Sequence, residues 1–226
     1  MELVNVAVAR AIAILDLAEL NNRGLRVYPD LLDSIRKKYD FDKEADPAKL
    51  ENRYKLFNGF YSTNHGKVTV GLQLYSDGVW AETNTNTTDS EAFLNDLLNW
   101  SKTELGMNYS PGMIKSKGYQ SELVIRSNIV LTTVCDGLSK FAKRLASVPF
   151  NGRAKRQELV TVSFGADGDP SANFTFDRRT GAPFAENKFY CRAPLPTDEH
   201  FRLLQEFEAL FLEPATGRAV NIEHEE

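Results

Sequence analysis

Residues 68–83 carry the clearest structural pattern in the sequence. Apolar side chains recur there at every second position: Val68, Val70, Leu72 and Leu74. The next three residues, Ser76-Asp77-Gly78, are typical of a tight turn, and Val79 to Thr83 is expected to be the return strand. Strict alternation predicts a hairpin with one buried face, so the fold must contain a sheet and a layer that covers it.

The composition is that of an ordinary globular protein. The chain has 226 residues, of which 42% are hydrophobic and 26% charged, so a sizeable core can form. The formal net charge of −4 is too small to identify a partner. Two cysteines, Cys135 and Cys191, exclude a disulfide scaffold, and their wide separation excludes a C-x-x-C pair. This usage fits a reducing compartment, and we expect a soluble, cytoplasmic protein.

The N-terminal residues 3–20 are apolar on nearly every side of a helical projection. Charged and amide side chains interrupt the run at Asn5, Arg10, Asp16 and Glu19. The run is too short and too charged for a membrane span, and it lacks a signal-peptide pattern. We therefore predict a buried helix here and no membrane association.

The remaining patterns predict an α+β fold. An N-terminal helical segment is expected to precede a mostly antiparallel or mixed sheet that helices cover. The expected helices span residues 3–20, 29–39, 47–58, 89–105, 136–146 and 197–212. The expected strands beyond the first hairpin span residues 123–134, 159–164, 173–177 and 184–192.

These elements suggest how the chain is divided. We expect an N-terminal helical segment over residues 1–60 and an α+β sheet domain over residues 61–213. An internal boundary is expected near residues 149–152, and residues 214–226 are expected to form a mobile acidic tail. A hairpin, a polar loop and a helix opened by Thr-Asp occur at 68–105 and again at 159–212. This echo indicates either a duplicated unit or the common way in which a helix follows a sheet.

No catalytic motif is present in the sequence. Phosphate-loop, dinucleotide-binding, zinc-protease and nucleophile-elbow patterns are all missing. Of three histidines, His65 is expected in an exposed turn and His200 in the first turn of the last helix, both in structural roles. The Asp167-Gly168-Asp169 sequence lacks the later ligands of a calcium loop and predicts a tight turn. No catalytic residue, metal site or cofactor is predicted.

The charge distribution is the one positive signal. Residues 115–156 contain nine Lys or Arg residues against two acidic ones, a net +7 that leaves −11 for the rest of the chain. Within it, the helix around 136–146 should place three charges on one face, and two more follow beyond a loop: Lys140, Lys143, Arg144, Lys155 and Arg156. This segment predicts either a nucleic-acid surface or a basic face that meets acidic elements of a protein.

The leading functional hypothesis is a non-catalytic protein–protein interaction or assembly protein, with self-association as one form. Abundant aromatic residues can anchor interfaces, and the candidates near hairpins are Tyr75, Trp80 and Phe184. The first alternative is a nucleic-acid-binding protein that uses the basic segment. The second is a metal-assisted hydrolase, for which two strand or turn carboxylates would have to converge: Asp77, Glu82, Asp167, Asp169 or Glu186.

Overall fold

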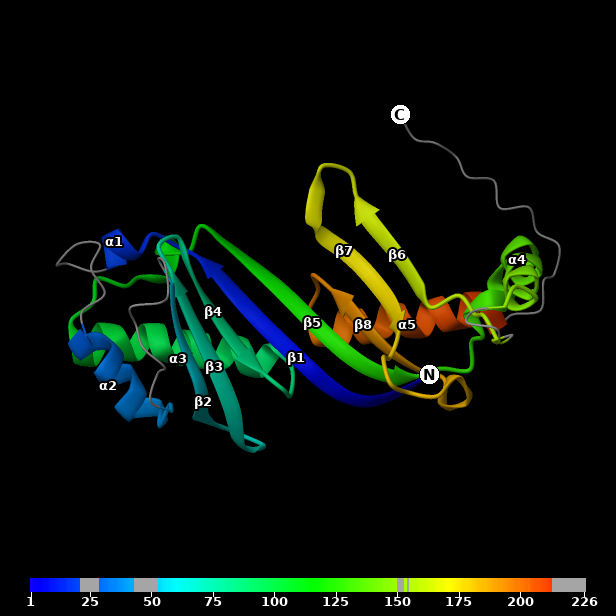
Figure 1. Ribbon diagram of the computed structural model, residues 1–226. Coiled ribbons are helices and arrows are strands. Elements are labelled where there is room, and N and C mark those ends of the chain that lie inside the picture. The colour runs from blue at the N-terminus through cyan, green and yellow to red at the C-terminus, as the bar shows by residue number, and fades with distance from the viewer. Residues whose placement is uncertain (21–28, 43–52, 150–152, 154, 213–226) are drawn as a thin grey trace.

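The computed structural model describes residues 1–20, 29–42, 53–149, 153 and 155–212. Within these ranges the chain forms one eight-stranded antiparallel sheet with helices packed on one face (Figure 1). The strands are β1 (Glu2–Ile14), β2 (Arg53–Thr63), β3 (Gly66–Tyr75), β4 (Gly78–Thr83), β5 (Ser116–Arg126), β6 (Thr161–Ala166), β7 (Asp169–Arg178) and β8 (Lys188–Ala193).

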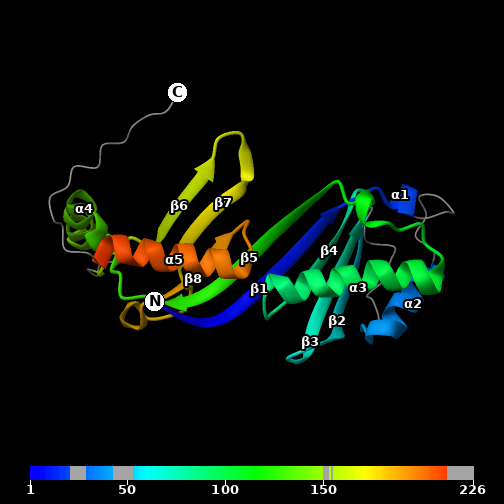
Figure 2. The same cartoon turned by 180° about the vertical axis from the view of Figure 1, so that it is seen from behind.

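The helices come between and after these strands. They are α1 (Leu17–Leu20), α2 (Pro29–Tyr39), α3 (Thr87–Leu105), α4 (Asp136–Ala146) and α5 (Thr197–Leu212). The described residues also contain three short 3-10 helices, η2 (Pro111–Met113), η3 (Leu131–Val134) and η4 (Phe184–Glu186). Helices α3 and α5 lie on the same face of the sheet, which we call the inner face; the opposite side is the open face (Figures 1 and 2).

The predicted N-terminal helical segment is wrong, and with it the predicted fold class. Residues 2–14 form β1, a strand that pairs with β4 on one edge and β5 on the other. The prediction rests on the apolar character of residues 3–20 on nearly every side, but Ala9, Ala11 and Ala13 alternate on the buried inner face of the strand. Their small side chains lie in the layer that α3 covers, and the two flanking strands pair the backbone on both edges.

Two other predicted elements differ from the structure. The helix expected from Asp46-Pro47 to residue 58 is contradicted over residues 53–58, which lie in β2, and its start falls outside the described residues. The strand expected to run to Val134 ends at Arg126, and Leu131–Val134 is η3. The predicted tail at 214–226 and residues 150–152 of the predicted boundary also lie outside the described residues.

The sheet repeats one arrangement of strands twice. Its order is β2-β3-β4-β1-β5-β8-β7-β6. Strands β1 to β4 and strands β5 to β8 therefore form two sets with the same arrangement, in which the second strand lies at the edge and the first strand lies at the centre of the sheet. We call residues 1–105 the first half and residues 116–212 the second half. Each half also has a helix between its first and second strands, α2 or α4, and ends in a long helix, α3 or α5.

The two halves meet where their long helices begin. The Thr87 amide donates to Oγ1 of Thr197, and the Thr197 amide donates to Oγ1 of Thr87, both at 3.0 Å. Each threonine thus satisfies a free amide at the start of the other helix. The sequence echo aligned Thr88 with Thr197, whereas this reciprocal pair makes Thr87 the equivalent residue, one position earlier.

The second residue pair at this junction differs between the halves. In α3, the Ser90 hydroxyl donates to the carbonyl of Ala9 at 2.8 Å. The equivalent residue in α5 is His200, whose Nδ1 lies 2.7 Å from Oγ of Ser121. The imidazole is fully buried, Nε2 has no hydrogen-bond partner among the described residues, and the ring packs edge-on against Phe174. Burial lowers the pKa of His200 to about 4.

The buried core is much larger in the first half. Among the described residues, nineteen buried apolar residues form the cluster on the first-half side, including three from α2: Leu32, Ile35 and Tyr39. Eight form the cluster of the second half, and none of these belongs to α4. Because the strand order is the same in both halves, the difference lies in what covers the sheet.

We predict that His200 makes the protein less stable as the pH falls from 6.5 to 4. Above pH 6.5 the imidazole is neutral in both the folded and the unfolded chain. Between the unfolded pKa and the folded pKa of about 4, the unfolded chain binds a proton that the buried ring excludes. The free energy of unfolding should therefore fall by about 3 kcal/mol over this range.

The measurement is urea unfolding of the wild type and His200→Gln at pH 7 down to pH 4.5. The substitution should reduce the dependence of unfolding free energy on pH, whereas His65→Gln, at an exposed turn, should leave it unchanged. Equal pH dependence in the wild type and His200→Gln would contradict the prediction.

Candidate interaction surface

Helix α4 lies at the end of the second half, beyond the C-terminal end of α5 (Figures 1 and 2). Its apolar residues recur at helical spacing, but only Ala142 is buried. Leu138 is 40% exposed and Phe141 is 59% exposed, whereas Leu145 is half-buried. An amphipathic helix in a globular protein normally buries such a stripe against its own core. The stripe of α4 is therefore largely unpartnered in this chain.

The equivalent helix in the first half shows how this type of helix packs. In α2, Leu32, Ile35 and Tyr39 have the same spacing of three and four residues as Leu138, Phe141 and Leu145. All three α2 residues are buried, and the Tyr39 ring packs edge-on against Phe93 of α3 at 5.0 Å between centroids. The same pattern is thus buried in one half and exposed in the other.

Exposed apolar side chains concentrate in the second half. Nine of the thirteen large ones among the described residues lie between residues 130 and 212, whereas β2 contributes two, Phe57 and Phe60. The nine are Val130, Leu138, Phe141, Val148, Val160, Phe164, Leu210, Phe211 and Leu212. The second half therefore keeps more of its large apolar side chains at the surface than the first half does.

The β6–β7 hairpin contributes part of this apolar surface. Phe164 of β6 is 55% exposed and pairs across the hairpin with Phe174, at 6.2 Å between ring centroids. Val162 and Phe174 are only half-buried. The strand positions equivalent to these two in the first half, Leu56 and Val70, are fully buried in one cluster with α2. The inner face of the β6–β7 hairpin is therefore less covered than that of the β2–β3 hairpin.

A hydrogen bond and an ion pair hold the chain in place before and after α4. Before the helix, Leu131 and Thr132 of η3 are buried, and Oγ1 of Thr132 accepts a hydrogen bond from the Leu159 amide at 2.8 Å. After it, the buried carboxylate of Glu158 pairs with the buried guanidinium of Arg178 at 2.8 Å. These contacts join the two ends of the segment that carries α4, so the helix projects from a fixed base.

The structure spreads the basic segment over several places. Lys117 and Arg126 lie at opposite ends of the long strand β5, where they pair with Glu91 and Glu2. Arg156, a predicted nucleic-acid contact, pairs with the buried Glu158. The net charge of +7 in the sequence therefore does not form one continuous face.

Three basic residues do share one face. Lys140, Lys143 and Arg144 are exposed on α4, within about 100° of arc and opposite the apolar stripe. None of the three forms an ion pair with another described residue. Lys155 is also exposed and follows the helix after nine residues. Helix α4 is thus amphipathic, with a basic face directed away from its apolar stripe.

The predicted interface anchors lie elsewhere in the molecule. Tyr75 and Trp80 are half-buried on the open face, 5.1 Å apart between ring centroids, and the Arg10 guanidinium lies 5.9 Å above the Trp80 ring. Phe184 is half-buried in η4, 4.8 Å from the guanidinium of Arg178. Each of the three aromatic rings therefore has an intramolecular contact, and the fold does not bring them together into one patch.

A row of paired charges crosses the centre of the open face. Arg10 donates to Glu82 at 2.6 Å and to Gln120 at 3.0 Å, and Gln120 donates to Glu122 at 2.8 Å. Arg192 completes the row with an ion pair to Glu122 at 3.3 Å. The Arg10–Glu82 and Glu122–Arg192 pairs occupy equivalent positions of the two halves with the charges exchanged. The four charges of this row therefore balance one another within the chain.

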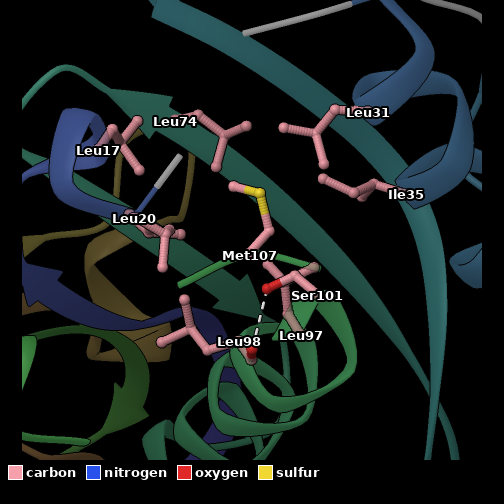
Figure 3. Close-up of a pocket in the computed structure, with 10 residues that line it drawn as sticks. Leu17, Leu20, Leu31, Ile35, Leu74, Leu97, Leu98, Ser101 and Met107 are labelled. Carbon is pink, nitrogen blue, oxygen red and sulfur yellow. Dashed lines mark hydrogen bonds between the residues drawn. The ribbon is translucent and has the colours of Figure 1, made fainter. Parts of the chain in front are cut away.

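The first half contains a small apolar cavity of about 40 Å³. Leu17 of α1, Ile35 of α2 and Met107 line it together with residues of α3 (Figure 3). Its one polar lining residue, Ser101, donates its hydroxyl to the carbonyl of Leu98. Pockets for small-molecule ligands usually measure about 300 Å³ or more. This cavity is therefore a packing gap in the core.

The structure does not gather the five carboxylates of the hydrolase hypothesis. Asp77 lies in the β3–β4 turn, Glu82 in β4, Asp167 and Asp169 at the β6–β7 turn, and Glu186 in η4. Within the described ranges there is no group of three or more His, Cys, Asp or Glu side chains that could hold a metal ion.

In the same ranges, no helix combines the length and the apolar character needed to cross a membrane.

Sequence reasoning found the basic face of α4 but missed the exposure of its apolar stripe. The sequence does contain a sign that α2 and α4 are equivalent helices, because a pattern in α2 recurs in α4, 106 positions later. The triplet Leu32, Ile35 and Tyr39 recurs as Leu138, Phe141 and Leu145, and Lys37-Lys38 recurs as Lys143-Arg144.

Comparison of the sequence with protein-family models and with curated proteins gives no match.

We predict that the two equivalent helices differ in what they contribute to stability. Ile35→Ala should lower the free energy of unfolding by about 2–4 kcal/mol, because Ile35 is buried and the substitution leaves a cavity. Phe141→Ala should lower it by less than about 1 kcal/mol, because that ring is mostly exposed. Urea denaturation in dilute solution measures both, and a loss for Phe141→Ala as large as that for Ile35→Ala would contradict the prediction.

Proposed function

We propose that this protein is a non-catalytic interaction protein that binds another protein molecule through its second half. The observation that carries the proposal is the unequal cover of two halves with the same strand order. The first half buries the apolar stripe of α2, whereas the second half leaves Leu138 and Phe141 of α4 and Phe164 of β6 exposed. A partner that covers these residues would gain the free energy that α2 supplies within the chain.

The difference in core size and surface between the two halves supports this proposal. The first half has the larger core, and the apolar stripe of α2 belongs to it. The second half has a smaller core and keeps its large apolar side chains at the surface. Exposed aromatic side chains on a helix and a hairpin are frequent anchors of protein interfaces.

The test is affinity capture from lysate, with proteins identified by mass spectrometry. The tagged wild type is compared with a Leu138→Glu, Phe141→Glu variant and with a Phe57→Glu, Phe60→Glu variant. The second variant is a matched control, because it changes the two exposed aromatic residues of β2 in the first half. We expect captured proteins that the control retains and the α4 variant loses. Identical capture by all three proteins would contradict the proposal.

The second candidate function is nucleic-acid binding, and the unpaired basic face of α4 favours it. Lys140, Lys143 and Arg144 are exposed together without an acidic partner among the described residues. Binding through such a face would be electrostatic and tolerant of sequence. On duplex DNA, the logarithm of affinity should fall with the logarithm of salt concentration by about 0.9 per phosphate contact.

Fluorescence anisotropy with labelled duplex and single-stranded oligonucleotides tests this candidate. Lys143→Glu with Arg144→Glu should abolish binding at low salt, whereas Lys37→Glu with Lys38→Glu should not. The control residues are exposed at the equivalent positions of α2, so both variants change the net charge equally. Absence of binding at low salt, or equal loss in both variants, would remove nucleic acid as a partner.

A further inference from the structure

The exposed stripe of α4 and the uncovered hairpin β6–β7 are complementary surfaces of one chain. In the first half, the equivalents of both belong to one buried cluster, in which Ile35 and Tyr39 of α2 join Leu56 and Val70 of the strands. In the second half, Phe141 and Phe164 are each more than half exposed. The first half therefore shows that a helix with this stripe and strands with these apolar positions pack together.

We propose that two copies of this chain associate reciprocally, with α4 of each copy packed on the inner face of the β6–β7 hairpin of the other. This inference rests on the proposed function and names a second copy as the partner. Such an exchange is symmetric, because the same two surfaces of each chain are used once. It covers Leu138 and Phe141 of α4 and Val162 and Phe164 of β6 in both copies.

Charge also favours this pairing. The basic face of α4 carries Lys140, Lys143 and Arg144. Between Gln157 and Asp177 the hairpin segment contains only acidic charged residues, two of them, Asp167 and Asp169, at its turn. Of the three basic residues, Arg144 lies about 60° from Phe141 around the helix, so a helix laid on the hairpin brings this charge to the rim of the apolar contact. Complementary rim charges increase the association rate and fix the relative orientation of the partners.

The fixed base of α4 explains why the contact forms between chains. The Thr132–Leu159 hydrogen bond and the Glu158–Arg178 ion pair hold both ends of the segment at η3 and β7. In both views α4 lies beyond the end of α5, and the turn of the β6–β7 hairpin extends in a different direction (Figures 1 and 2). Within one chain the two surfaces are therefore held apart, whereas a second copy can present both.

The first measurement is sedimentation velocity over a wide range of protein concentration. The wild type should be a dimer at high concentration and dissociate on dilution. Phe141→Asp and Phe164→Asp should each reduce the association constant at least about 30-fold, because each buries a charge at the centre of the contact. Phe57→Asp is the matched control: it is 54% exposed on β2 and should leave the association constant unchanged. Circular dichroism verifies that all variants are folded.

The second measurement identifies the contact. In a Cys135→Ser background, one chain carries Leu138→Cys and a second, differently tagged chain carries Phe164→Cys. Mild oxidation of the mixture should give a disulfide between the two tags. In a single chain with both substitutions at high dilution, an intramolecular disulfide would show that α4 closes on its own hairpin and would overturn the exchange.

Three other results would also overturn it. They are a monomer at every concentration, a dimer that Phe141→Asp and Phe164→Asp leave unchanged, and absence of the disulfide between differently tagged chains. A monomer that still captures a partner protein in a Phe141-dependent manner would leave the proposed function standing and refute self-association alone. A monomer without any such capture would refute both.

Discussion

The antiparallel pair of β1 and β5 is the contact on which both halves of the structure depend. It runs nearly the full length of both strands and pairs Ala9 with Ser121 at its centre. Directly over this point, Thr87 and Thr197 exchange hydrogen bonds at the start of α3 and α5. A buried helix start needs acceptors for its free amides, and here each half supplies one to the other. The pair therefore fixes the sheet and the helix layer together.

Equivalent positions in the two halves show why their cores differ in size. Leu74 of β3 corresponds to Arg178 of β7, and Leu98 of α3 corresponds to Glu208 of α5. A buried charge requires partners, and Arg178 finds them in Glu158 and in the backbone carbonyl of Phe184. The second half therefore places two charged groups at positions where the first half has apolar side chains.

The carboxylate of Glu208 has the same effect on the other side of the second half. It accepts hydrogen bonds at 2.8 Å from the hydroxyl of Ser127 and from the amide of Asn128, and it pairs with the amino group of Met1. The residues between β5 and η3 therefore contact α5 through Glu208. Helix α4 follows them and lies beyond the end of α5 (Figures 1 and 2). Helix α4 and its exposed apolar stripe therefore follow a segment that Glu208 holds against α5.

By itself, the sequence determined the elements in which local pattern and tertiary environment agree. The hairpin at 68–83 alternates because one face is buried, and the helices beginning near residues 87, 136 and 197 have apolar stripes at helical spacing. It also located the basic face of α4, because residues three and four apart share a face wherever a helix forms. Only the tertiary structure decided that residues 2–14 form a central strand, since a run that is apolar on nearly every side fits a buried helix or a buried strand, and here β4 and β5 pair both of its edges. It alone decided that the stripe of α4 stays exposed while the same stripe in α2 is buried, because burial depends on what the rest of the chain places opposite the helix.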